Sequence, residues 1–377
     1  MLATFEDFRR AAKRRLPKVL FDYVDGGSYA EHTLAANVAD FARVELRQRV
    51  LRDVSKLETG VDLFGTRYSM PIALAPVGMA GLYARRGEVQ AARAAQKAGV
   101  PMCLSTLSIC GLEEMSKVAP PWFQLYVLKD RGYMRELIAR AKALGSPVLV
   151  FTVDLPVPGA RYRDQRSGLF GGGAAAGLRL AWDGAMHPGW LWDVWLMGQP
   201  NSFANVEKAV GKGASFTDFW VWVRKNFDPT ITWDDLAWIK DAWDGPIVIK
   251  GILDAEDAKR ACAAGADGIV VSNHGGRQLD GAPSSIRALP AIAEAVGDRA
   301  TVLMDGGVRS GLDVLKALSL GAKACLIGRP WAFALGARGR RGVSAMLAIL
   351  REELKTAMAL TGCTDVAKAG PDLLFRS

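Results

Sequence analysis

The chain has 377 residues, a formal net charge of +9 and hydrophobic side chains at half of its positions. This length and hydrophobicity exclude a disordered chain, and they suit either two or three average domains or one large α/β barrel. The positive charge favours an anionic partner, but we find no nucleic-acid-binding motif, and the five cysteines lack the spacing of a zinc site or a disulfide framework.

The first 65 residues predict a helical lead-in with irregular connections. FEDFRRAAKRRL is amphipathic, and DYVDGGS is typical of a turn. We find neither the apolar core of a signal peptide nor a run of about 18 apolar residues that could span a membrane. We therefore expect one domain over residues 1–377, with residues 1–65 leading into it.

From residue 71 onward, short apolar runs alternate with helical segments such as GEVQAARAAQKAG, several of which end in glycine. Runs such as VLVFTV and GIVVS are apolar throughout, which is typical of parallel strands covered on both faces. The pattern predicts a (β/α)₈ TIM barrel, with a doubly wound open sheet as the alternative. The expected strands are 71–75, 101–104, 122–127, 147–153, 246–250, 268–272, 301–305 and 324–328.

One connection is much longer than the others. About ninety residues separate Leu155 from Pro246, and nine of the eleven tryptophans of the chain lie in this part. We interpret it as a Trp-rich insertion of about residues 165–230 after the fourth barrel strand. Its tryptophans suit a membrane interface, and the alternatives are an internal small core or an oligomer interface.

Polar side chains gather where the expected strands end, which is the active-site face of such barrels. The last two strands are followed by DGGVRSG and IGR, which place glycine amides and an arginine after each strand. Barrels often bind a phosphate in these loops, so we predict a phosphate site there, with plain tight turns as the alternative. Its residues are Gly306, Gly307, Arg309, Gly328 and Arg329.

These residues carry a resemblance to a known family. The chain resembles the FMN-dependent α-hydroxy-acid dehydrogenase/oxidase family from about residue 5 to 365. The motifs that carry this resemblance are SNHGGRQ (272–278), the preceding strand that ends in Lys250, the DGGVR and GR that follow, and an early ALAP. Segments such as DYVDGGSY, PGARYRD and FDPTITWDDLAWI resemble most the bacterial, quinone-linked members that oxidise L-lactate. The resemblance implies an FMN-binding barrel that oxidises a 2-hydroxy acid.

The residues and the resemblance together predict His274, Asp154, Arg277 and Tyr126 as catalytic residues, with Arg161 as a further substrate-binding residue. His274, one of three histidines in the chain, is the expected base. Asp154 is expected to lie against it and stabilise its protonated form, although a helix cap is an equal alternative. Arg277 and Arg161 are expected to grip the substrate carboxylate, because a guanidinium matches two oxygens; for Arg161, the alternative is a solvated charge run.

Three more residues are expected to contact the substrate. Tyr23 and Tyr126 are implied as hydrogen-bonding partners, although either could be a packing residue. In the family, the position of Leu107 lines the pocket beside the substrate side chain, where a large aromatic accompanies glycolate and a small residue accompanies mandelate. Leucine therefore favours L-lactate.

The same resemblance implies the FMN contacts. Lys250 would face the N1/C2 carbonyl edge of the flavin and stabilise negative charge on the reduced ring. FMN carries the redox chemistry, and the protein groups tune it. Besides the five residues of the phosphate site, the expected cofactor contacts are Ala75, Pro76, Ser105, Gln124, Thr152, Lys250, Ser272 and Asp305.

The expected activity is oxidation of L-lactate to pyruvate. No haem-binding domain precedes the barrel, so we expect oxygen or a membrane quinone as acceptor and favour the quinone. The net positive charge and the Trp-rich insertion favour peripheral attachment to the cytoplasmic face of the bacterial inner membrane, and the family suggests a tetramer. The alternatives are an oxidase of another 2-hydroxy acid, such as glycolate or mandelate, that uses oxygen, and a non-redox FMN-binding isomerase.

Overall fold

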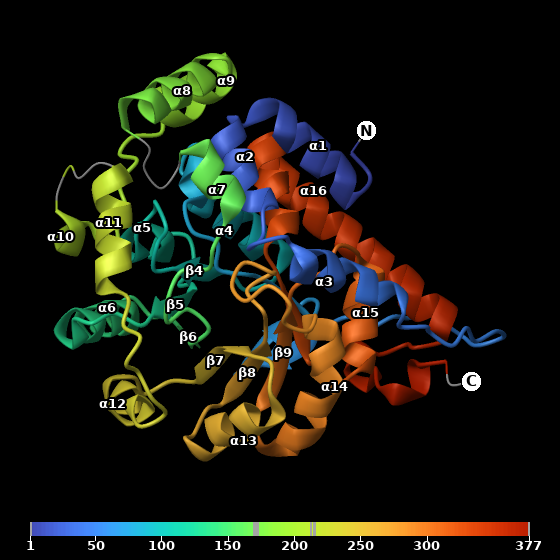
Figure 1. Ribbon diagram of the computed structural model, residues 1–377. Coiled ribbons are helices and arrows are strands. Elements are labelled where there is room, and N and C mark those ends of the chain that lie inside the picture. Colours follow the sequence, from blue (N-terminus) through green and yellow to red (C-terminus); the bar gives the residue numbers. More distant parts are fainter. Residues whose placement is uncertain (1, 169–172, 212, 214–215, 376–377) are drawn as a thin grey trace.

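The computed structural model describes residues 2–168, 173–211, 213 and 216–375 (Figure 1). Eight parallel strands form one sheet in the order β3-β10-β9-β8-β7-β6-β5-β4. A parallel bridge between Leu74 and Met102 brings the two ends of the sheet together, so the strands form a barrel as predicted. The strands are β3 (Ile72–Leu74), β4 (Cys103–Ser105), β5 (Trp122–Tyr126), β6 (Leu149–Thr152), β7 (Ile247–Ile252), β8 (Gly268–Val271), β9 (Thr301–Asp305) and β10 (Ala324–Ile327).

The apolar runs become strands because both of their faces are covered. Every residue of β6 and β8 is buried, as expected for VLVFTV and GIVVS. Side chains such as Val150 and Leu303 fill the interior of the barrel, and the opposite faces of the strands pack against the surrounding helices. One residue along a strand therefore points into the barrel and the next toward a helix.

The helices around the barrel follow their strands in sequence (Figure 1). As predicted, a glycine in the left-handed region follows α4, where Gly99 has a φ of 69°. The last helix, α16, bends at Arg338 and Gly339 and packs along α1 and α4. The helices are α4 (Gly87–Ala98), α5 (Leu112–Ser116), α6 (Arg131–Ala143), α12 (Asp235–Ala242), α13 (Ala255–Ala263), α14 (Ser285–Val296), α15 (Gly311–Ser319) and α16 (Arg329–Thr361), with short turns at Ala80–Leu82, Gly297–Arg299, Val366–Lys368 and Pro371–Leu373.

The lead-in forms three helices and a hairpin. The helices are α1 (Phe5–Arg15), α2 (Lys18–Asp25) and α3 (His32–Ala42), and α2 ends at the polar rim of the barrel. The antiparallel strands β1 (Val61–Leu63) and β2 (Thr66–Tyr68) were not expected. Two three-residue strands are too short to give a clear alternating pattern.

The hairpin covers the end of the barrel where the strands begin. Val61 and Leu63 are buried in the cluster that fills the barrel, and Phe64 packs edge-on against Trp122, the first residue of β5. The hairpin therefore closes this end, and only the carboxyl ends of the strands are left to line a cavity.

The long connection between β6 and β7 is helical. It contains α7 (Tyr162–Ser167), α8 (Gly173–Ala185), α9 (Pro188–Trp190), a π-helical turn at Leu191–Leu196, α10 (Glu207–Val210) and α11 (Phe216–Asn226). Parts of the predicted insertion, residues 169–172, 212 and 214–215, lie outside the described residues. No helix in the described part of the chain is long and apolar enough to cross a bilayer.

Candidate active site

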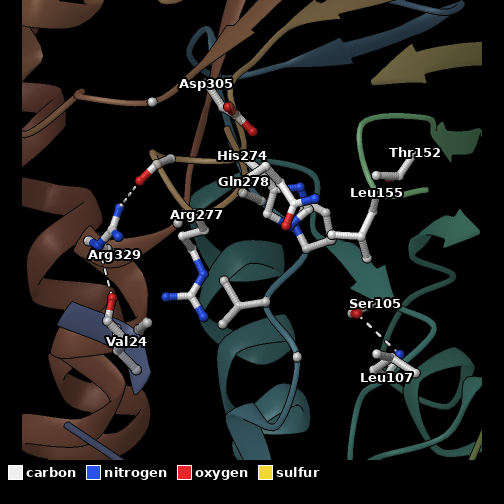
Figure 2. A pocket seen from close by; sticks show the side chains of 18 of the residues that line it. Val24, Ser105, Leu107, Thr152, Leu155, His274, Arg277, Gln278, Asp305 and Arg329 are labelled. Atoms are coloured by element: carbon white, nitrogen blue, oxygen red, sulfur yellow. Dashed lines mark hydrogen bonds between the residues drawn. The ribbon is translucent and has the colours of Figure 1, made fainter. Parts of the chain in front are cut away.

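A cavity opens at the carboxyl ends of the barrel strands. Of the predicted site residues, Gln124, Asp154 and Ser272 do not line it but lie beside residues that do. Figure 2 shows two sides of this cavity, with Asp305 and Arg329 on one and Ser105, Leu107 and Thr152 on the other. The predicted residues that line it are Tyr23, Ala75, Pro76, Ser105, Leu107, Tyr126, Thr152, Arg161, Lys250, His274, Arg277, Asp305, Gly306, Gly307, Arg309, Gly328 and Arg329.

His274 and Asp154 form a pair. His274 Nδ1 lies 2.9 Å from Asp154 Oδ1 and 3.2 Å from Oδ2. Burial opposes ionisation of Asp154, but the charge and hydrogen bond of the imidazole hold the pKa of this carboxyl below its ordinary value. When Asp154 accepts a hydrogen bond from Nδ1–H, the other ring nitrogen, Nε2, carries a free lone pair and can act as a base in the cavity.

The backbone at His274 is specialised. Its φ of 58° is unusual for a residue other than glycine, and Gly275 and Gly276 follow it in the same left-handed region. A Cβ on Gly276 would lie 2.6 Å from the backbone nitrogen of Leu34 in α3. The glycines of SNHGGRQ therefore let this loop turn and pack against the lead-in.

Lys250 lies in a buried polar cluster at the ends of β7, β8 and β9. Its Nζ is 3.0 Å from Asp305 Oδ2 and 2.9 Å from the Ser272 hydroxyl, which also accepts the His274 backbone N–H. Burial disfavours the ammonium, but the Asp305 and Asp154 charges raise the pKa of Lys250 above its ordinary value. Lys250 is thus a fixed positive charge at the cavity wall.

Arg161 and Arg277 converge on Tyr23. Their guanidinium carbons lie 5.5 Å and 4.6 Å from the centre of the Tyr23 ring. Arg277 also donates to the carbonyls of Tyr23 and Gly26. Burial and the nearby Arg277 charge lower the pKa of Arg161, so a bound anion would stabilise both cations.

Tyr126 lies against His274 of the His274–Asp154 pair. Its ring stacks on the His274 imidazole with centroids 6.5 Å apart and an angle of 19° between the planes. Burial and the nearby Tyr23 raise the pKa of the Tyr126 phenol, which therefore stays protonated and can donate a hydrogen bond.

Arg309 and Arg329 lie together at the predicted phosphate site. Burial lowers the pKa of Arg309 to about 10, and burial together with the Arg309 charge lowers that of Arg329. Three nitrogens of Arg329 donate to the carbonyls of Val24, Gly26 and Gly275. Two of these hydrogen bonds bind the lead-in, and Figure 2 shows the one to Val24. Two partly buried arginines beside each other form a site that a dianionic phosphate would stabilise.

Two buried side-chain atoms test whether FMN fits. In the described part of the chain, Gln124 Nε2 and Thr152 Oγ1 have no hydrogen-bond partner. Buried polar groups are normally satisfied, so an orphan hydroxyl in the cavity wall (Thr152) and an orphan amide beside that wall (Gln124) indicate a polar ligand. Ser105 and Thr152 end strands β4 and β6, and Gln124 of the intervening strand β5 pairs with Ser105, so the three could contact the polar edge of a flavin ring.

One wall of the cavity is apolar and was not expected from the sequence. Trp220, Val223 and Phe227 come from α11 and its end and line the cavity together with Leu107. Their spacing of three and four residues places them on one helical face, and this periodicity in FTDFWVWVRKNF could have revealed it. The Phe227 and Tyr126 rings lie 5.3 Å apart, so the insertion reaches the predicted substrate residues.

A buried amide pair was also missed. Asn37 and Asn273 donate to each other at 2.8 Å and 2.7 Å, and Asn273 Oδ1 also accepts the Gly276 N–H. The pair fixes the His274 loop to α3, two elements more than two hundred residues apart. No local pattern pairs these residues; only the SNHGGRQ motif hinted that Asn273 had a role.

Comparison with a family model matches residues 12–376 to the FMN-dependent dehydrogenases. A protein named L-lactate dehydrogenase from Caulobacter vibrioides (strain NA1000 / CB15N) is 59% identical over 376 residues, which cover 99% of this chain and 98% of that protein. Another of that name, from Alcaligenes faecalis, is 53% identical over 378 residues, which cover 100% of this chain and 99% of that protein.

The fold is also similar to a solved structure. A crystal structure described as the monotopic membrane protein (S)-mandelate dehydrogenase matches with a TM-score of 0.92 and 35% sequence identity, covering all of both chains. The similarity therefore extends over the insertion as well as the barrel.

Proposed function

The chain belongs to the family of FMN-dependent dehydrogenases, and from this premise we propose that it is an FMN-dependent L-lactate dehydrogenase that passes its electrons to a membrane quinone. One observation carries the proposal: the His274–Asp154 pair, the two arginines around Tyr23 and the Arg309/Arg329 pair all face one cavity. A base, a carboxylate site and a phosphate site are what a 2-hydroxy acid and FMN require together.

In the proposed reaction the substrate carboxylate binds Arg161 and Arg277. Its negative charge offsets the repulsion between the two guanidinium groups. His274 takes the hydroxyl proton, and Asp154 stabilises the resulting imidazolium. When bound, FMN supplies the acceptor for the hydride that leaves the carbinol carbon. Tyr126 donates a hydrogen bond to the substrate, and Lys250 provides positive charge at the proposed flavin edge.

The apolar wall suits an apolar substrate side chain. Leu107, Val223 and Phe227 line the cavity with largely buried side chains, so a substrate side chain next to them would contact apolar groups. Because the solved relative is described as a mandelate dehydrogenase, a phenyl-bearing acid is the competing substrate to test. The two lactate-named relatives favour the methyl group of L-lactate.

Anaerobic reduction of the bound flavin tests the proposal. The purified protein should be yellow, and L-lactate should bleach it faster than D-lactate, glycolate or mandelate. If mandelate bleaches the flavin faster, mandelate replaces L-lactate as the proposed substrate. If no 2-hydroxy acid bleaches the flavin, the FMN-binding isomerase is favoured. Peroxide formation in air, measured against reduction of a soluble quinone, separates an oxidase from a quinone-linked dehydrogenase.

An exposed apolar surface supports membrane attachment. It lies on α8, α9 and the turn that follows, which Figure 1 shows beside α2. Trp190 fixes it to the barrel by donating to the Leu82 carbonyl, and Arg15 forms an ion pair with Asp193 at 2.7 Å. We call it the apolar patch; its exposed residues are Leu178, Trp182, Met186, Trp192, Trp195, Leu196 and Met197.

The patch suits an interfacial anchor, because indole and aliphatic side chains insert together at the headgroup level of a bilayer. The solved relative is described as monotopic, and its similarity covers this segment. With a net charge of +9, we expect attachment to an anionic leaflet, such as the cytoplasmic face of a bacterial inner membrane. A quinone acceptor is consistent with that position.

A further inference from the structure

The side chain of Gln278 connects two loops of the active site. Its Nε2 donates to the carbonyls of Asp154, at 2.8 Å, and Val157, at 3.1 Å. Its Oε1 accepts the backbone N–H of Gly159 at 3.1 Å. Both hydrogens of the amide nitrogen and the amide oxygen thus bind one short segment that follows β6.

Each of the two loops carries two of the four charged residues proposed for the base and the carboxylate site. The loop after β8 carries His274 and Arg277, and Gln278 directly follows them. The loop after β6 begins with Asp154 and ends at Arg161, the residue that caps α7. The side chain of Gln278 therefore binds the second loop at Asp154 and again two residues before Arg161.

The backbones of the loops also touch at this point. A Cβ on Gly159 would lie 2.5 Å from the Arg277 carbonyl oxygen and 3.0 Å from the Gln278 Cα. No side chain fits between the two backbones here. The glycine and the glutamine side chain together set how closely the loops approach.

We propose that Gln278 is a positioning residue that holds the Asp154–Arg161 loop in register with the His274–Arg277 loop. This inference rests on the proposed function, since it concerns the same base and carboxylate site. Through its hydrogen bonds Gln278 fixes both the Asp154–His274 contact and the convergence of Arg161 with Arg277. Catalysis is sensitive to such registration, because a displacement of about 1 Å can lower a rate about 100-fold.

The loops have a second connection, which keeps the fold intact without Gln278. In the lead-in, the Ser28 N–H donates to the Gly276 carbonyl at 2.9 Å, and the Tyr29 N–H donates to the Ala160 carbonyl at 2.7 Å. Loss of the Gln278 amide should therefore loosen the loops without separating them. This makes the role of the side chain testable in a folded holoenzyme.

The test compares Gln278→Met and Gln278→Glu with the wild-type holoenzyme. Met keeps the length of the side chain but removes its strong hydrogen bonds, whereas Glu keeps the shape and removes the donor. Leu279→Ala, which truncates the exposed neighbouring side chain, is the matched control. The readouts are the rate of anaerobic flavin reduction at saturating L-lactate, the dissociation constant of oxalate, the flavin content and the melting temperature.

We expect both Gln278 variants to retain FMN and reduce it about 100-fold more slowly, with weaker oxalate binding, while Leu279→Ala matches the wild type. Gly159→Ala, which forces the loops apart, should show the same pattern. A Gln278→Glu enzyme as fast as the wild type would overturn the proposal. Variants that lose FMN and melt at a lower temperature but keep the wild-type rate per bound flavin would also overturn the proposal.

The two proposals fail in different ways. If L-lactate does not reduce the wild-type flavin, the proposed function is wrong for this substrate, and the comparison is repeated with the acid that does reduce it. If no acid reduces it, oxalate binding alone decides, because the carboxylate site is built from both loops. Unchanged oxalate binding in Gln278→Met would then overturn the positioning role.

Discussion

At the scale of single residues, the candidate site contains charged side chains, each of which needs a partner of opposite charge. Asp154 supports His274, Asp305 supports Lys250, and Asp164 lies 3.4 Å from Arg161. Burial lowers the pKa of Arg161 and Arg329, and a bound anion would favour both cations. The residue types were all visible in the sequence. The family resemblance also predicted the Asp154–His274 pair, but the Asp305–Lys250 pair was not predicted, because its partners are on different strands.

His274→Gln should slow flavin reduction by L-lactate by about two to four orders of magnitude while FMN stays bound. The reason is that glutamine cannot take up the hydroxyl proton, whereas the flavin contacts lie on other residues. Stopped-flow absorbance of the holoenzyme measures the rate. An unchanged rate would show that His274 is not the base.

Asp25 gives a prediction about pH. Arg9 binds both of its oxygens, at 2.6 Å and 2.9 Å, and Arg163 binds Oδ2 at 2.8 Å. Burial opposes ionisation, but these arginines lower the pKa of Asp25 below 3.8. The ion pairs therefore stabilise the fold above that pH, and this contribution is lost as the pH falls through the folded-state pKa.

Asp25→Asn should lower the free energy of unfolding by about 1–2 kcal/mol at neutral pH, a modest value because both guanidinium groups are partly exposed. The difference from the wild type should shrink as the pH falls below 3.8, where the wild-type carboxyl becomes protonated too. Denaturant unfolding over a pH series measures this. A constant difference at every pH would contradict the assignment.

At the scale of elements, the insertion combines two surfaces with different tasks. The face of α11 that carries Trp220 and Val223 lines the cavity, whereas the apolar patch on α8 to Leu196–Met197 faces outward. Between them, buried Asn205 donates to the Ser105 carbonyl and accepts the Leu112 N–H. The insertion is therefore part of the active site, and removing it whole would disturb the predicted flavin contacts.

Point substitutions test the patch more cleanly than a deletion. Trp182→Ser combined with Trp192→Ser should abolish flotation with vesicles that contain anionic lipid, because both indoles are largely exposed. Flavin reduction by L-lactate should be unchanged, since neither residue lines the cavity. Val50→Ser with Leu51→Ser, at an exposed loop elsewhere, is the control; equal loss of binding in the control would contradict an anchor at the patch.

At the scale of the whole molecule, the lead-in, barrel and insertion meet at one cavity. Tyr23 comes from the lead-in, Lys250 and Asp305 from the barrel, and Phe227 from the end of the insertion. The hairpin at the other end leaves these carboxyl ends as the place where ligands bind. A cofactor bound there contacts several parts of the chain and should stabilise them together.

FMN should therefore raise the melting temperature. At about 100 times its dissociation constant it would add about 2.7 kcal/mol, or roughly 3–4 °C for a chain of 377 residues. Riboflavin, which lacks the phosphate, should stabilise much less, because it cannot bind Arg309 and Arg329. Equal stabilisation by riboflavin and FMN would rule out the phosphate role of these arginines.

The sequence by itself determined the barrel, the order of its strands along the chain and the rim residues. Strands buried on both faces are apolar throughout, helices end in glycine, and parallel strands place their carboxyl ends at one rim. These are properties of neighbouring residues, which a sequence displays directly. The SNHGGRQ motif added the family, and the match over residues 12–376 confirmed it.

Only the tertiary structure decided the contacts between distant segments. Asn37 pairs with Asn273, Gln278 binds the segment from Asp154 to Gly159, and Arg329 donates to carbonyls of the lead-in. The positions of the short hairpin and of the inward face of α11 likewise depend on contacts between distant segments. Each depends on where the closed barrel brings two segments into contact, and the energy of such contacts comes from burial and complementary hydrogen bonds that local sequence does not encode.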